Sequence, residues 1–126
     1  MTQKYLKDLH SDHSEWIQNL QFYRDEIKTF KHRLEEIITQ NTKMEVTANV
    51  EHFQNQFIRQ NEVIDELIHD INAEEKKLVE NVQNNAVATD HRKMDVNEKL
   101  VDQMTTFVKI YSELKTEFNR FASDTL

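Results

Sequence analysis

The sequence of 126 residues contains no glycine, no proline and no cysteine. Because tight turns and β-hairpins rely on glycine and proline, their absence argues against β structure. A chain without glycine also lacks the glycine-rich loops that bind nucleotide phosphates. Without cysteine there is no disulfide framework, thiolate metal site or cysteine nucleophile. These absences favour an all-helical fold and fit a reducing compartment.

Long apolar runs and an excess of positive charge are missing as well. No apolar run approaches the roughly 20 residues that span a membrane, and the first residues lack the continuous apolar core of a signal peptide. We therefore expect a cytoplasmic protein that does not contact membranes. The formal net charge of −7 disfavours nucleic acid as a partner. Nine acidic and three basic residues between positions 45 and 85 favour a basic partner instead.

What the sequence does contain is a regular spacing of apolar residues. They recur at alternating steps of three and four, which places them on one stripe of a helix. The spacing predicts three helices, at about 3–39, 43–84 and 90–122, within one domain covering 1–126. Gln60 and Glu74 are polar residues at stripe positions. The stripes comprise Leu9, His13, Trp16, Leu20, Tyr23, Ile27, Phe30, Leu34 and Ile37, then Val46, Val50, Phe53, Phe57, Gln60, Ile64, Leu67, Ile71, Glu74 and Leu78, then Asn97, Leu100, Met104, Phe107, Tyr111, Leu114, Phe118 and Phe121.

The residues between the helices indicate how the helices end. Thr42 followed three residues later by Glu45 has the form of a capping box. Asn41 is suited to the left-handed backbone conformation where glycine is missing. Thr89 or Asp90 is a suitable N-cap for the third helix.

Short connections between long helices make sequential neighbours antiparallel. The sequence therefore predicts an all-α fold, an antiparallel up-down-up three-helix bundle of long, coiled-coil-like helices. Matching the three stripes places Phe30, Phe53 and Phe121 in one layer. It also places the phenol of Tyr23 opposite the amide of Gln60, where the two can form a buried hydrogen bond.

A candidate metal site lies on the outer face of the second helix. Glu62, Glu66 and His69 follow one another at steps of four and three, so they share a helix face. Imidazole and carboxylate groups are ligands for divalent cations. A solvated acidic face without a metal explains the same residues, and it is the favoured interpretation.

His13 stands out because it occupies a stripe position. A histidine there is commonly a satisfied core polar group that fixes the helix register. The sharper hypothesis is that His13 pairs with Glu74 or Asp70 near the open end of the bundle. We take His13 and Glu74 as the predicted pair, which would make this end pH-sensitive.

Three apolar residues outside the stripes form a candidate interaction surface. Phe22, Val63 and Ile110 fall at similar heights along the predicted bundle. Such a patch would suit a protein partner or self-association. The alternative is that they are isolated apolar residues, partly covered by long neighbouring side chains.

These patterns favour a non-enzymatic interaction or scaffold protein that binds a protein partner or forms a homo-oligomer. The alternative is a small metal-binding bundle that uses histidine and carboxylate ligands. Nucleophilic catalysis needs a nucleophile held against a base in a cleft, and a packed rod of three helices is not expected to offer one. We therefore expect no enzymatic activity and no cofactor.

Overall fold

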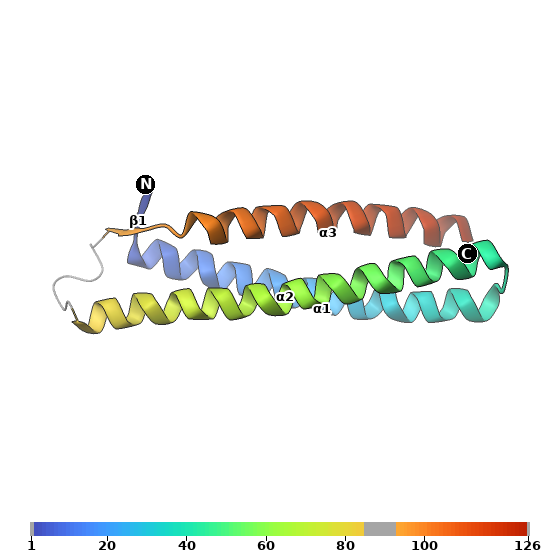
Figure 1. Ribbon diagram of the computed structural model, residues 1–126, viewed down its shortest axis with the longest axis horizontal. Coiled ribbons are helices and arrows are strands. Elements are labelled where there is room, and N and C mark those ends of the chain that lie inside the picture. Colours follow the sequence, from blue (N-terminus) through green and yellow to red (C-terminus); the bar gives the residue numbers. More distant parts are fainter. Residues whose placement is uncertain (1, 85–92, 126) are drawn as a thin grey trace.

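The computed structural model describes residues 2–84 and 93–125. Three helices make up most of them: α1 spans Leu6–Gln40, α2 spans Met44–Asn84 and α3 spans Glu98–Thr125. Two short strands, β1 at Gln3–Tyr5 and β2 at Lys93–Asp95, precede α1 and α3. Figure 1 shows the helices lying lengthwise beside one another in an elongated rod. The predicted all-α helical bundle is confirmed.

The strands shorten two of the predicted helices. Residues 3–5 were expected to be helical but form β1, and α3 begins at Glu98 instead of near position 90. The strands pair antiparallel, with Lys4 opposite Met94. This pairing needs no tight turn, because α1 and α2 separate the two strands in the sequence. The lack of glycine and proline therefore disfavours hairpins but does not prevent this ribbon.

Asparagines stand after the end of α1 and before the start of α3. The side-chain oxygen of Asn97 accepts a hydrogen bond from the backbone N–H of Leu100 at 3.1 Å, which caps α3. Asn41 is extended, with φ −140°, and is not left-handed as predicted. Its side chain accepts a bond from the Lys43 N–H at 3.1 Å. Thr89 and Asp90, the predicted caps of α3, lie outside the described residues.

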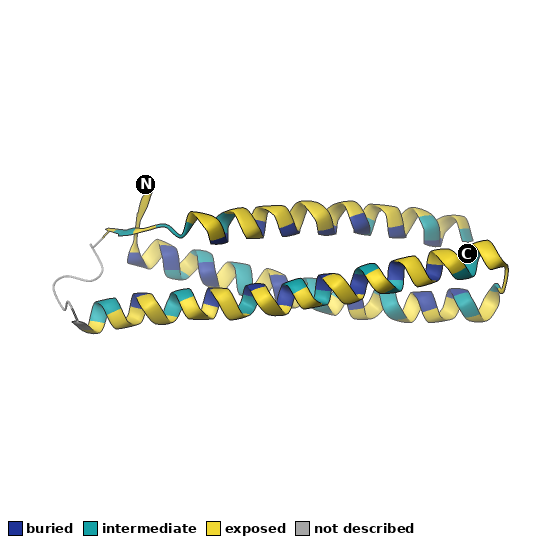
Figure 2. Cartoon of the chain, in the orientation of Figure 1, coloured by how far each residue is buried: buried dark blue, intermediate teal, exposed yellow. Residues whose placement is uncertain are grey.

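The apolar stripes of the three helices meet in one core. In Figure 2 the buried positions recur along the facing sides of the helices, and the outer sides are exposed. Phe57 is fully buried, and its ring centroid lies 5.5 Å from that of Phe30 on α1 and 5.3 Å from that of Phe118 on α3. None of the described helices has an apolar stretch long enough to cross a lipid bilayer.

The predicted register is right for α2 against α3 and wrong for α1 against both of them. Phe53 packs on Phe121, with ring centroids 5.2 Å apart, as expected for α2 and α3. Phe30, however, contacts Phe57 and Phe118, so α1 is displaced by about one turn from the predicted layer. A heptad stripe still matches its neighbour after such a shift, because apolar positions recur every three or four residues.

The same displacement changes the environment of Gln60. Gln60 is buried, with 6% of its surface exposed, as expected for a stripe position. Tyr23 packs its ring against those of Tyr111 and Phe107, at centroid distances of 4.8 and 5.9 Å. In the part of the chain that the structure describes, the predicted hydrogen bond between the Tyr23 phenol and the Gln60 amide is not formed.

We predict that Phe57→Ala lowers the free energy of unfolding by about 3–5 kcal/mol, since it removes a fully buried aromatic ring and leaves a cavity. Phe22→Ala is the matched control, because the Phe22 side chain is 58% exposed, and it should stay within about 0.5 kcal/mol of the parent chain. Urea unfolding followed by circular dichroism measures both. Equal losses would contradict the placement of Phe57 at the centre of the core.

Candidate functional site

A groove with a volume of about 690 Å³ lies between α2 and α3. Its apolar lining comes from Val63 and Leu67 of α2 and from Phe107 and Ile110 of α3. Leu67 and Phe107 belong to the buried core, whereas Ile110 is 44% exposed. The groove therefore brings solvent into contact with the outer edge of the core.

The groove runs lengthwise because its lining residues share one face of each helix. On α2 they are residues 59, 60, 63, 66, 67 and 70, and on α3 they are residues 99, 102, 103, 106, 107 and 110. Steps of three and four keep side chains on one face of a helix. Twelve positions on each helix correspond to roughly 17 Å of helix axis, or about three turns. The site is thus an elongated groove between two neighbouring helices.

Charged side chains border this apolar floor. At one end the Arg59 guanidinium contacts the Glu62 carboxylate at 3.1 Å and the Glu66 carboxylate at 3.8 Å. Near the other end the lining includes Asp70 from α2 and Asp102 from α3, together with Lys99. The charged lining thus contains three carboxylates, at residues 66, 70 and 102, and two cations, at residues 59 and 99.

The structure brings together two of the three residues predicted to form an interaction surface. Val63 and Ile110 line opposite walls of the groove. Phe22 does not line it: this residue lies on α1, where its ring packs against Tyr23 with centroids 5.9 Å apart. The apolar spacing predicts only a core position for Leu67 and Phe107. These two residues also line the groove because α2 and α3 pack side by side. The apolar spacing does not reveal that packing.

A second polar cluster joins α1 to α2 near the strands, and it corrects a prediction. Both oxygens of the Glu75 carboxylate are engaged: Oε2 lies 2.5 Å from Nδ1 of His10, and Oε1 contacts Nδ1 of His13. His13 is buried, with 4% of its surface exposed. The predicted partner Glu74 instead accepts a hydrogen bond from the Asn97 amide at 3.0 Å. The partner of His13 is therefore Glu75, not Glu74.

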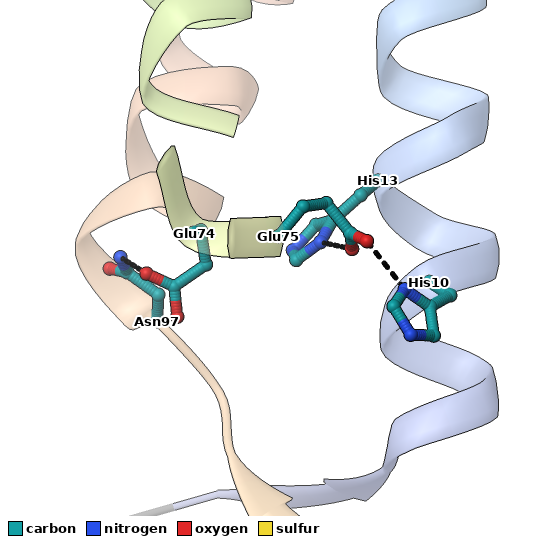
Figure 3. Close-up of polar contacts among 5 residues, drawn as sticks. All are labelled: His10, His13, Glu74, Glu75 and Asn97. Atoms are coloured by element: carbon teal, nitrogen blue, oxygen red, sulfur yellow. Dashed lines mark hydrogen bonds and ion pairs between the residues drawn. The ribbon is translucent and has the colours of Figure 1, made fainter. Parts of the chain in front are cut away.

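Figure 3 shows the reason for this correction. Consecutive residues on a helix point about 100° apart, so neighbouring glutamates on α2 reach different helices. Glu75 points toward His10 and His13 on α1, while Glu74 points toward Asn97 at the start of α3. The displacement of α1 by about one turn changes which carboxylate His13 meets. The pH sensitivity of this end stays a prediction, now with Glu75 as the carboxylate.

The three predicted metal ligands do not assemble into a site. Within residues 2–84 and 93–125, no group of three or more histidine or carboxylate side chains is arranged to hold a metal ion. Arg59 contacts both Glu62 and Glu66, and His69 is exposed on the same helix. At these positions the outer face of α2 is therefore exposed to solvent and carries ion pairs, as the alternative interpretation expected.

A third polar cluster, which was not predicted from the sequence, joins α1 to α3. The Tyr111 hydroxyl donates a hydrogen bond to Oε1 of Glu26 at 2.9 Å, and the Lys115 ammonium donates to Oε2 at 2.6 Å. Burial raises the pKa of the Tyr111 phenol, and its hydrogen bond to Glu26 raises that pKa further. The position of Tyr111 on an apolar stripe could have predicted such a contact, since a buried phenol usually has a hydrogen-bond partner.

Comparisons with known proteins add no functional information. The chain matches no protein-family model, and neither a curated protein nor a solved structure is significantly similar to it.

We predict that Glu75→Gln destabilises the chain more than Glu74→Gln does. The Glu75 carboxylate is engaged by two imidazoles, and a hydrogen bond to a charged group contributes about 1.5–3 kcal/mol. A glutamine at position 74 keeps an oxygen that can accept the bond from Asn97. Urea unfolding at neutral pH compares the two variants, and a larger loss for Glu74→Gln would restore the original assignment.

The raised pKa of Tyr111 predicts a loss of stability at alkaline pH. The folded chain retains a phenolic proton that the unfolded chain releases near the ordinary tyrosine pKa of about 10. The stabilisation is therefore complete below about pH 10 and is lost as the pH rises toward the folded-state pKa. In Tyr111→Phe the free energy of unfolding should decrease less steeply above about pH 10 than in the parent chain. Tyr23→Phe, which keeps the Tyr111–Glu26 bond, should show the parent slope, and identical slopes in all three chains would contradict the assignment.

Proposed function

We propose that this chain is a non-enzymatic interaction protein that binds a protein partner in the groove between α2 and α3. The observation that carries the proposal is the apolar lining formed by Val63, Leu67, Phe107 and Ile110 within a polar and charged border. Protein interfaces combine an apolar centre with a polar rim in this way. Exposed apolar surface with a polar border is a common feature of binding sites.

The shape of the groove favours a helical segment as the bound part of the partner. An amphipathic helix places its apolar face into an elongated apolar groove through residues at steps of three and four. Two neighbouring helices of a bundle offer such a surface, and a further helix laid between them completes a four-helix arrangement. Val63 and Ile110, which face each other across the groove, would then be covered.

Binding would also remove the exposed apolar area at Ile110. Covering apolar surface contributes roughly 25 cal/mol for each Å² removed from water. The polar side chains at the border would keep their contact with water at the rim of the complex, where they add little to affinity but limit the choice of partner. The floor of the groove thus supplies affinity, and its border supplies specificity.

The test is site-specific photo-crosslinking in cells that produce this chain from its own gene. A photoreactive phenylalanine analogue replaces Ile110 in the groove, and in a matched chain it replaces Val108, which is also exposed on α3 but does not line the groove. We expect a covalent adduct with a different protein from position 110 and none from position 108. An adduct formed only with a second copy of this chain, or no adduct at position 110, would overturn the proposal.

A further inference from the structure

The charges around the groove indicate what kind of helix it accepts. Helix α2 carries nine acidic and three basic residues between positions 45 and 84. One of the basic residues, Arg59, already contacts Glu62 and Glu66. Asp65 pairs with Arg24 of α1, and Glu75 faces the histidines of α1. The carboxylates of α2 and α3 that line the groove are those of Glu66, Asp70 and Asp102.

The excess of negative charge extends to the lining of the groove itself. Asp70 and Asp102 approach the groove from α2 and α3, with Lys99 as the basic residue at the same end. Both aspartates are exposed in the absence of a partner. A partner with lysine or arginine at its rim would place positive charge opposite these two groups. Opposite charges across an interface increase the association rate and select the partner.

We propose that the occupant of the groove is a positively charged amphipathic helix of about three turns, with apolar residues at steps of three and four and basic residues beside them. This inference rests on the proposed function and specifies the chemistry of its partner. The apolar residues of the bound helix contact Val63, Leu67, Phe107 and Ile110. Its basic residues lie beside Asp70 and Asp102.

A second copy of this chain is a poorer occupant, for a reason of shape. Filling a groove requires a ridge of apolar side chains on the partner. In the described ranges, the exposed large apolar residues away from the groove include Phe22 on α1, Ile58 and Val79 on α2, and Val108 on α3. With Met44, which is also exposed, α2 carries three such residues. They are separated by 14 and 21 positions, so none of these helices presents a continuous exposed ridge.

Charge gives a second and independent reason against self-association. Each copy has a formal net charge of −7. Two acidic surfaces brought together repel each other, and juxtaposed like charges oppose binding. Shape and charge together favour a basic amphipathic helix from another protein.

The test uses three synthetic peptides of equal length. The first is an amphipathic helix with lysines on its polar face, the second has the same apolar stripe with glutamates in place of the lysines, and the third has the composition of the first in an order that breaks the helical spacing. Fluorescence anisotropy measures their affinity for the full chain. We expect the lysine peptide to bind at least about tenfold more tightly than either of the others.

Matched variants locate the binding and test its charge dependence. Ile110→Ser should weaken binding of the lysine peptide by about tenfold, whereas Val108→Ser should leave it unchanged. The double variant Asp70→Lys, Asp102→Lys should reverse the preference, so that the glutamate peptide binds more tightly. The control is Glu113→Lys, Glu117→Lys, which makes the same change in net charge at two exposed positions of α3 outside the groove. It should keep the preference for the lysine peptide.

The outcomes separate this inference from the proposed function. Equal binding of the lysine and glutamate peptides would overturn the charge requirement. Equal binding of the reordered peptide, or a reversal by the control double variant, would show general charge attraction and overturn the helical occupant. Failure of all three peptides, with a successful crosslink at position 110 to another protein, would overturn this inference alone. Failure of both experiments would overturn the proposed function as well.

Discussion

The packing of Phe57 against all three helices is the contact on which the rest of the rod depends. Its ring meets Phe30 of α1, Phe53 of α2 and Phe118 of α3, at centroid distances of 5.5, 6.4 and 5.3 Å. Each aromatic ring buries a large apolar area, so this cluster holds the helices together where no disulfide is available. Polar contacts between the helices add to this apolar cluster.

Those polar contacts differ between the helix pairs and make the packing specific. Glu75 connects α2 to two histidines of α1, and Glu26 connects α1 to Tyr111 and Lys115 of α3. An apolar stripe allows more than one register, since neighbouring turns offer similar surfaces. A buried or half-buried carboxylate is costly without a partner, and the observed register supplies partners to both glutamates. The polar clusters thus favour the observed register over others that the apolar core alone would permit.

The candidate binding groove lies between α2 and α3 on the side that α1 does not cover. The residues of α2 and α3 that face α1 are covered, whereas the groove is lined by α2 and α3 alone. Part of the core edge, at Leu67 and Phe107, therefore lines a surface that is also exposed at Ile110. The same helices that complete the fold provide the site at which we propose that a partner binds.

The sequence by itself determined the three helices and most of the buried residues, because helical period and burial are recorded in the spacing of apolar side chains. It also identified Val63 and Ile110 as surface apolar residues, although it grouped them with Phe22. Only the tertiary structure decided that His13 meets Glu75, that Phe30 meets Phe57, and that β1 pairs with β2. The physical reason is that a repeating stripe specifies which side of a helix is buried but not how far the helix slides along its neighbour. That position, and the groove beside it, depend on contacts between residues far apart in the chain.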